Sequence, residues 1–279
     1  MNEQEHLSRA EVHRADRGST PRPEAGMAEA ADRGAHEPLG PAIVVLTGAG
    51  VSRESGLATF RDPDGIWAEV RVEDVATPQA FARDPARVHA FYDARRVQLR
   101  DPAIRPNAAH HALARLAREH IGPMLVVIQN VDDLHERAGQ LNLLHMHGEL
   151  VKARCLRCGE VSPFEGAGLA DALCPACGAQ ALRPHVVWFG EVPPHTDRIE
   201  SWLRTNCDLF VAVGTSGQVY PVAGFAQTAR VHGARTVELN LEPTEATGGF
   251  DEARHGPATE VVPAWVEELL STYIEDIPL

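Results

Sequence analysis

Short, uninterrupted apolar runs constrain the fold of this chain more than any other feature of its sequence. Six runs recur between residues 42 and 241, and they read AIVVL, MLVVIQN, LNLLHMHG, HVVWFG, DLFVAVGT and RTVELNL. Stretches with helical spacing lie between several of them, at 84–99 and 107–120, and another closes the chain at 257–275. Continuous apolar strands that alternate with helices are typical of a parallel sheet covered on both faces. The sequence therefore predicts an α/β fold, a Rossmann-like parallel sheet with helices on both faces.

Polar or glycine-rich motifs mark the ends of five of these runs. They read TGAG, QN, HG, VGTS and LN. In open α/β sheets, ligands bind outside the carboxyl ends of the strands. We therefore expect the five motifs to converge on one cleft.

The turn after the first run has the spacing of a modified phosphate-binding motif. Gly48 and Gly50 form Gly-x-Gly, but the third glycine of G-x-G-x-x-G would stand at position 53, which is Arg53. Glycines at such a turn allow backbone N–H groups to approach a pyrophosphate at a helix start. The acidic residue that usually follows about 20 residues later is missing from its expected context. A dehydrogenase that transfers hydride is therefore a poor fit.

Four cysteines have the spacing of a zinc site. Cys155 and Cys158 form one C-x2-C pair, and Cys174 and Cys177 form a second pair 15 residues later. This pattern is typical of tetrahedral zinc sites, and four thiolates leave no coordination position open for a water. The sequence therefore predicts a smaller domain with one structural zinc ion, whereas Cys207 is interpreted as a packing residue. A zinc-ribbon module that binds nucleic acid is the alternative, and the acidic composition disfavours it.

Charge and segment composition narrow the class of partner. The chain has 279 residues and a net charge of −13, which argues against non-specific binding to nucleic acid or to anionic membranes. No apolar run approaches the roughly 18 residues of a membrane helix, and the amino-terminal region has no secretory signal core. We therefore expect a cytoplasmic protein, by default a monomer. Residues 1–38 have almost no large apolar side chain and are predicted to form a disordered tail before a folded domain at 39–279.

Seven motifs, in order, resemble those of one family. They read GAGVSRESGLATFR, QNVDDLHERAG, HMHGEL, the two CxxC pairs, VVWFGE, VGTSGQVYPVA and LNLEPT. The chain resembles the sirtuins, NAD-dependent protein-lysine deacylases, and is most similar to the bacterial CobB type. The resemblance runs from about residue 41 to the last helix. It implies a zinc module at 151–185 inserted in the Rossmann-like domain, NAD as a consumed co-substrate, and acylated-lysine proteins as substrates.

The resemblance also implies where NAD binds. Residues 48–50 would hold the pyrophosphate, and 52–67 would be a mobile cofactor loop that closes over the nicotinamide ribose. Residues 129–132 would contact the ribose and the carboxamide, and 214–216 with 240–242 would hold the adenosine half. Glu242 would supply the acidic ribose contact that the glycine motif lacks, whereas Asp132 is equally well explained as a helix N-cap. The resemblance assigns NAD contacts to Gly48, Ala49, Gly50, Ser52, Phe60, Arg61, Trp67, Gln129, Asn130, Asp132, Gly214, Thr215, Ser216, Asn240, Leu241, Glu242 and Ala258.

The motif HMHGEL contains the implied catalytic residue. His147, before Gly148, matches the catalytic position, and His145 is interpreted as structural. The near-neutral pKa of histidine suits a general base. In the implied reaction, the acyl-lysine oxygen attacks the ribose carbon and nicotinamide leaves. His147 then deprotonates a ribose hydroxyl, and the products are free lysine and O-acyl-ADP-ribose.

Two further motifs are interpreted as substrate contacts. Val187 and Phe189 of VVWFGE would line an apolar channel for the lysine stem, while Val186 fits a core strand equally well. Tyr92 and Arg95 lie three residues apart on an expected helix, hence on one face. They resemble the Tyr-x-x-Arg of sirtuins that remove succinyl and malonyl groups, because a phenol and a guanidinium can hold a carboxylate. An arginine on a helix is otherwise most often a solvated surface residue.

Two other functions are compatible with the family resemblance. The first is an enzyme that transfers ADP-ribose to proteins or hydrolyses NAD. The second is a non-catalytic sensor of NAD or ADP-ribose, against which the presence of Asn130, Asp132 and His147 argues.

Overall fold

The computed structural model describes residues 40–57, 70–217 and 221–275, which fall in one compact unit, Pro38–Leu279. A six-stranded sheet with every neighbouring pair parallel forms its centre. The fold class predicted from the sequence is thus confirmed. In order across the sheet the strands are β3 Leu143–His145, β2 Met124–Ile128, β1 Ile43–Thr47, β7 Leu209–Val213, β8 Arg235–Asn240 and β9 Glu252–His255.

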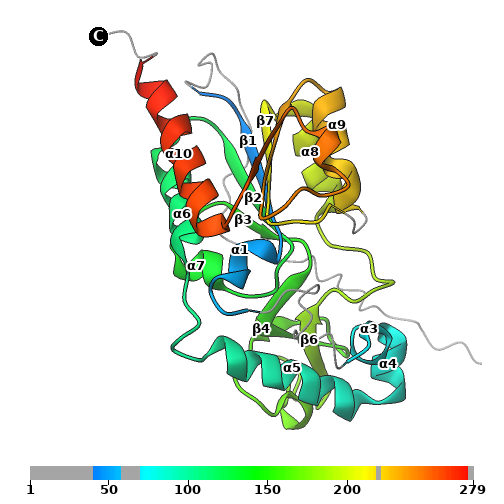
Figure 1. Ribbon diagram of the computed structural model, residues 1–279. Helices are drawn as coiled ribbons and strands as arrows, with labels where there is room; N and C mark the ends of the chain where they lie inside the picture. The colour runs from blue at the N-terminus through cyan, green and yellow to red at the C-terminus, as the bar shows by residue number, and fades with distance from the viewer. Residues whose placement is uncertain (1–39, 58–69, 218–220, 276–279) are drawn as a thin grey trace, which may run out of the picture. The chain divides into compact units, whose positions relative to one another are not determined.

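Helices cover both faces of this sheet (Figure 1). Helices α6 and α10 pack on one face, and α8 and α9 pack on the other. The helices with six or more residues are α4 Pro78–Arg83, α5 Pro85–Leu99, α6 Ala108–Glu119, α8 Thr196–Thr205, α9 Phe225–Val231 and α10 Ala258–Glu275. Single turns are α1 Gly50–Arg53, α3 Val72–Val75, α7 Leu134–Arg137 and the 3-10 turns Leu169–Asp171, Val222–Gly224 and Thr247–Gly249.

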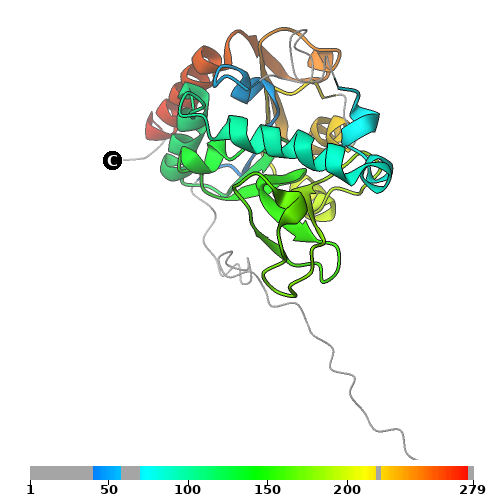
Figure 2. The same ribbon diagram turned by 90° about the horizontal axis from the view of Figure 1, so that it is seen from below.

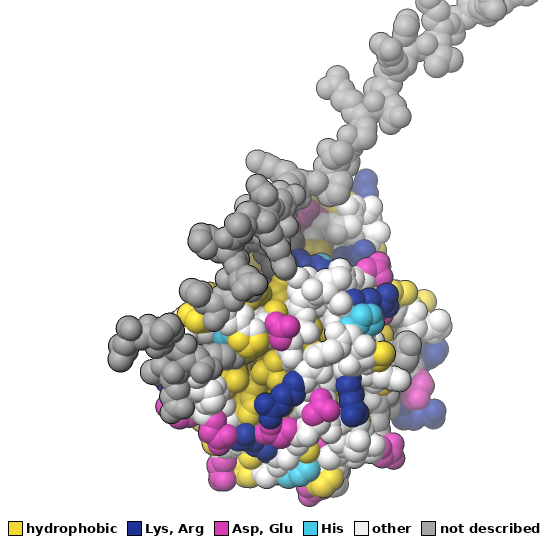
Figure 3. Space-filling view, turned by 90° about the horizontal axis from the view of Figure 1, so that it is seen from above, with side chains coloured by type: hydrophobic (Ala, Val, Ile, Leu, Met, Phe, Trp, Pro, Cys, Tyr) yellow, Lys and Arg dark blue, Asp and Glu magenta, His cyan; other side chains and the backbone are white. Residues whose placement is uncertain are grey.

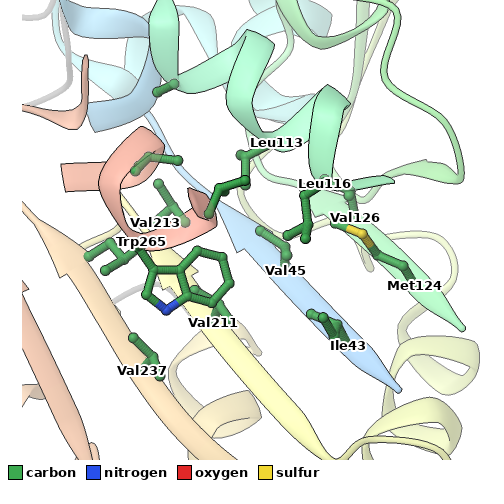
Figure 4. Packing of buried hydrophobic residues seen from close by; sticks show 14 of the residues in the cluster. Ile43, Val45, Leu113, Leu116, Met124, Val126, Val211, Val213, Val237 and Trp265 are labelled. Atoms are coloured by element: carbon green, nitrogen blue, oxygen red, sulfur yellow. The ribbon is translucent and has the colours of Figure 1, made fainter. Parts of the chain in front are cut away.

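Alternate residues of β1 enter two different cores, which explains why its first four residues are all apolar. Ile43 and Val45 pack with α6 and α10, while Val44 and Leu46 pack with α8 and α9. Figure 4 shows the first core, where Trp265 of α10 lies over the sheet beside residues of α6. The predicted packing role of Cys207 is confirmed, since it is buried in the second core.

The prediction that the run HVVWFG forms a strand of the parallel sheet is wrong. The run HVVWFG lies mostly beyond β6 (Leu182–Val186), which belongs to a separate three-stranded sheet in the order β5-β4-β6. In that sheet, β4 (Gly148–Cys155) pairs antiparallel with β6 and with β5 (Val161–Pro163). The sixth parallel strand is instead β9, an edge strand with charged side chains and no apolar run.

Helix α5 lies along the small sheet (Figure 2). The buried Arg96 joins them, since its Nε donates to the carbonyl of Gly166 at 3.0 Å and its Nη1 to that of Leu150 at 3.4 Å. Arg96 also pairs with Asp93, whose second oxygen accepts the amide of Gly168 at 2.7 Å. The helix that bears Tyr92 and Arg95 is therefore fixed to β4 and to the loop between β5 and the turn Leu169–Asp171.

Strands β1 and β7 are neighbours in the middle of the sheet. The strands after β1 in the chain, β2 and β3, lie on one side of this pair, and β8 and β9 lie on the other side. The turns that follow β1 and β7 touch each other. The amide of Gly50 donates to the carbonyl of Gly214 at 2.8 Å. Gly214 has a φ of +57°, and a Cβ placed there would lie 2.5 Å from the backbone nitrogen of Val51. A side chain at Gly214 would thus push the two turns apart.

Charges on the surface are of mixed sign. On the face that Figure 3 shows, basic and acidic side chains are interspersed with apolar ones. None of the helices in the described part of the chain has the length and apolar character needed to cross a membrane.

Replacement of Gly214 by alanine should strongly destabilise the protein. The left-handed φ and the collision with the α1 turn together predict a loss of roughly 2 to 4 kcal/mol in the free energy of unfolding. Gly248→Ala is the matched control, because an added Cβ meets no atom within 4 Å there, and we expect a change within about 0.5 kcal/mol. Denaturant unfolding of both variants measures this difference. Equal stability of the two variants would contradict the steric argument.

Candidate active site and cysteine cluster

The motifs at the strand ends line one cleft of about 1320 Å³. It lies outside the carboxyl ends of β1, β2, β7 and β8 and extends to α5 and the segment after β6. Phe60, Arg61 and Trp67 lie outside the described residues. The predicted NAD and substrate residues that the structure describes all line this cleft, and these are Gly48, Ala49, Gly50, Ser52, Gln129, Asn130, Asp132, His147, Gly214, Thr215, Ser216, Asn240, Leu241, Glu242, Ala258, Tyr92, Arg95, Val187 and Phe189.

The amides of Gly48 and Gly50 are engaged within the protein. Gly48 donates to the carbonyl of Val213 at 3.0 Å, and Gly50 donates to that of Gly214. Cβ atoms on these two glycines would lie 2.7–2.8 Å from Gly214 and Thr215. Their contribution is therefore the absence of side chains where the turns meet, rather than donation of their own N–H groups to a phosphate.

A buried polar network occupies the floor of the cleft. The Ser52 hydroxyl donates to Asp132 Oδ2 at 3.0 Å and accepts from the amide group of Asn130 at 2.9 Å. Asp132 Oδ1 accepts the amide of Leu134, the first residue of α7, at 3.1 Å. Asp132 thus supports the helix start as expected, although the N-cap position itself is Asp133. Burial raises the pKa of the Asp132 carboxyl to about 6.

His147 lies in the link between β3 and β4, with its tautomer fixed by the backbone. Its Nδ1–H donates to the carbonyl of Gln129 at 2.8 Å, because a carbonyl only accepts. This leaves Nε2 as the basic nitrogen of a ring that lines the cleft. Burial lowers the pKa of His147, against the opposing effect of the Gln129 carbonyl, so the ring is neutral at pH 7. His145 instead pairs with Glu136, in agreement with a structural role.

Tyr92 and Arg95 of α5 line the same cleft. The Tyr92 oxygen accepts the indole N–H of Trp188 at 3.0 Å. Arg95 Nη1 donates to the carbonyl of Phe91 at 3.0 Å, and the guanidinium stacks 3.5 Å from the centroid of the Phe91 ring. Arg95 Nη2 is buried and has no hydrogen-bond partner among the described residues. Burial lowers the pKa of Arg95 to about 10, so the group stays positively charged at neutral pH. A buried cationic donor without a partner is suited to an anionic ligand.

The segment after β6 forms the adjacent wall. The amide of Val187 donates to the carbonyl of His147 at 2.9 Å, and the amide of Phe189 donates to the carbonyl of Ala76 at 3.0 Å. The Phe189 side chain is 50% exposed, whereas Val186 is buried in a core cluster, as its core-strand interpretation requires.

The other end of the cleft is held by amide side chains. Gln129 Nε2 donates to the hydroxyl of Thr215 at 2.9 Å, and Asn240 Nδ2 donates to the carbonyl of Thr215 at 2.8 Å. Leu241 and Glu242 follow β8 and are exposed. Their side chains are therefore accessible to a ligand in the cleft.

Three site-supporting residues were missed in the sequence. His110 Nε2 lies 3.5 Å from the Ser52 hydroxyl, and His135 Nε2 lies 3.2 Å from that of Thr47. Burial lowers the pKa of His110 to about 4. Glu54 accepts the amide and hydroxyl of Thr259 at the start of α10. For His110, the local signal is the capping box that it forms with Asn107 at the start of α6.

The four predicted zinc ligands form one cluster in the small sheet region. Their Sγ atoms lie within 4.8 Å of one another, and both Cys155–Cys177 and Cys158–Cys174 are separated by 3.7 Å. Zinc–sulfur bonds of about 2.3 Å in a tetrahedron place the sulfurs about 3.8 Å apart. The geometry therefore fits one zinc ion with four thiolate ligands and no open position.

Removal of one cluster thiol should release the metal. We expect Cys174→Ser to lower the zinc content, measured by plasma mass spectrometry, well below one ion per chain and to lower the melting temperature, because zinc binding contributes to folding. Cys207→Ser, outside the cluster, should keep the zinc. Full zinc occupancy in the Cys174 variant would contradict a four-thiolate site.

Comparisons with known proteins agree with this geometry. Residues 48–221 match the Sir2 family. Proteins named NAD-dependent protein deacylase are similar over 231 residues, or 82% of this chain. The one from Salmonella typhimurium is 54% identical with 84% of its length covered, and the one from Escherichia coli K12 is 55% identical with 82% covered.

Solved structures of Sir2 proteins share the fold. A Sir2 homologue in complex with NAD is 40% identical, with a TM-score of 0.75 over 83% of this chain and 90% of its own. A Sir2 variant bound to a deacetylated p53 peptide and 3'-O-acetyl ADP-ribose is 27% identical, with a TM-score of 0.70 over 81% of this chain and 93% of its own. Together with the family match, these relatives show that the chain belongs to the Sir2 family.

Proposed function

We propose that this protein removes acyl groups, acetyl and succinyl or malonyl, from protein lysines in an NAD-dependent reaction that gives nicotinamide, O-acyl-ADP-ribose and free lysine. One observation carries the proposal: the His147 ring, whose Nε2 is the basic nitrogen, lines the same cleft as Val187 and Phe189. The protein is proposed to act in the cytoplasm as a monomer on acylated-lysine proteins.

The residues of the large sheet fit NAD. The turns after β1 and β7 meet without side chains at Gly48, Gly50 and Gly214, and the cleft lies outside them, where a pyrophosphate is proposed to bind. Asn130 and Asp132 offer a donor and an acceptor, which a carboxamide requires. When bound, NAD supplies the ribose carbon that the acyl oxygen attacks. Exposed Glu242 is proposed to accept hydrogen bonds from the adenosine ribose.

His147 is proposed to act as the general base. Its bond to the Gln129 carbonyl holds the proton on Nδ1, so Nε2 can accept a proton from a ribose hydroxyl. The imidazolium that results would remain hydrogen-bonded to the same carbonyl. The lowered pKa of His147 keeps the base form populated at neutral pH.

Tyr92 and Arg95 are proposed to recognise the carboxylate of dicarboxylic acyl groups. Arg95 presents a buried N–H without a partner in the described structure, and a carboxylate would satisfy it with a charge-assisted bond. Val187 and Phe189 are proposed to contact the lysine stem.

Loss of His147 should abolish deacylation. We expect His147→Tyr to reduce NAD-dependent turnover of an acetyl-lysine peptide by at least about 100-fold, measured by mass spectrometry. In the unsubstituted protein, turnover should fall as the pH drops through a pKa below 6.5, because protonation removes the base. If NAD disappears while neither acetyl nor succinyl peptide is deacylated, the protein is an ADP-ribosyltransferase or NAD hydrolase and the proposal is wrong.

Loss of Arg95 should change acyl selectivity. We expect Arg95→Met to lower the ratio of kcat/KM for succinyl-lysine over acetyl-lysine by roughly 10- to 100-fold, because one charge-assisted hydrogen bond is removed. Arg87→Met, an exposed arginine of the same helix outside the cleft lining, is the control and should keep the ratio. An unchanged ratio in the Arg95 variant would refute the carboxylate assignment.

A further inference from the structure

Tyr92 uses its hydroxyl oxygen as an acceptor inside the protein. The indole Nε1–H of Trp188, a group that can only donate, lies 3.0 Å from this oxygen. Tyr92 is 4% exposed, and burial raises the pKa of its hydroxyl to about 12, so it keeps its hydrogen at neutral pH. Because the oxygen accepts from the indole, the hydroxyl hydrogen must point away from Trp188. No described residue accepts that hydrogen.

The indole that imposes this orientation is itself held on several sides. The guanidinium of Arg183 stacks 3.4 Å from the centroid of the Trp188 ring, and Phe81 contacts the ring at 5.2 Å between centroids. Glu191 accepts the backbone amide of Trp188 at 2.8 Å and forms a two-point ion pair with Arg183 at 2.6 and 3.0 Å. Trp188 is 2% exposed, so its N–H direction is determined by the fold.

We propose that Trp188 is a positioning residue for acyl selectivity: its indole N–H turns the Tyr92 hydroxyl into a dedicated donor toward a substrate carboxylate. Arg95, whose Nη2 has no partner among the described residues, would bind the same carboxylate. The inference rests on the proposed deacylase function and adds a residue that does not itself touch the carboxylate. Without the indole N–H, the Tyr92 hydrogen can rotate toward the position that Trp188 now occupies. The hydroxyl then offers a lone pair to the carboxylate in part of its population, and that contact is repulsive.

A substitution that removes the N–H but keeps an aromatic ring tests the proposal. We expect Trp188→Phe to lower the succinyl-over-acetyl ratio of kcat/KM by about 3- to 10-fold, the size of one neutral hydrogen bond, through a higher KM for the succinyl peptide. Phe81→Leu is the control, because it loosens the packing around Trp188 and leaves the N–H in place, so the ratio should hold. Thermal unfolding of each variant confirms that it is folded.

A double-mutant cycle separates positioning from general damage. If Trp188 acts through the Tyr92 hydroxyl, Trp188→Phe should have no further effect on the ratio in a Tyr92→Phe background. Independent, multiplying effects of the two substitutions, or equal losses for both peptides, would overturn the inference. If the succinyl-over-acetyl ratio falls in Arg95→Met but is unchanged in Trp188→Phe, only the role of Trp188 is refuted. If the ratio is unchanged in both variants, the assignment of Tyr92 and Arg95 to the substrate carboxylate is refuted as well.

Discussion

The contact between the backbones of the turns after β1 and β7 is the constraint on which the cleft depends. Gly50 bonds directly to Gly214, and neither position has room for a Cβ. The strand order reverses at this point, so the helices that follow β1 and β7 leave the sheet on opposite faces and a crevice opens between them. Side chains from β2 and β8 reach the crevice because their strands end at the same edge.

The two walls of the cleft hold buried charges at a cost in stability. Asp132 lies on the side of the cleft formed by the large sheet, and burial raises the pKa of its carboxyl. Arg95 lies on the side formed by α5, and burial lowers the pKa of its guanidinium. In both cases the fold favours the charged form less than water does. Groups of this kind are concentrated at functional sites, where ligand contacts outweigh the stability that a neutral residue would add.

Local patterns predicted the parts of this protein that local forces determine. The β1 run is apolar throughout because it enters two cores, and the cysteine spacing suffices for a tetrahedral cluster. Edge strand β9 was not predicted because it has no apolar run: three of its four residues, Glu252, Arg254 and His255, are polar, and none of the four is buried. The bond between Tyr92 and Trp188 joins residues 96 positions apart, and no local signal reports such a contact. The roles of the cleft residues stay predictions until they are tested.

The position of His147 has a mechanical consequence. Its ring is bonded to Gln129 of the large-sheet side, while its carbonyl accepts the amide of Val187 at the end of the small sheet, and Gly148 begins β4 directly after it. His147 thus stands at the joint between the two sheets, with its ring held by the large one and its backbone held by the small one. A displacement of either sheet relative to the other would strain or break one of these two hydrogen bonds. The direction in which Nε2 points is therefore a joint property of both sheets, and neither sheet fixes it alone.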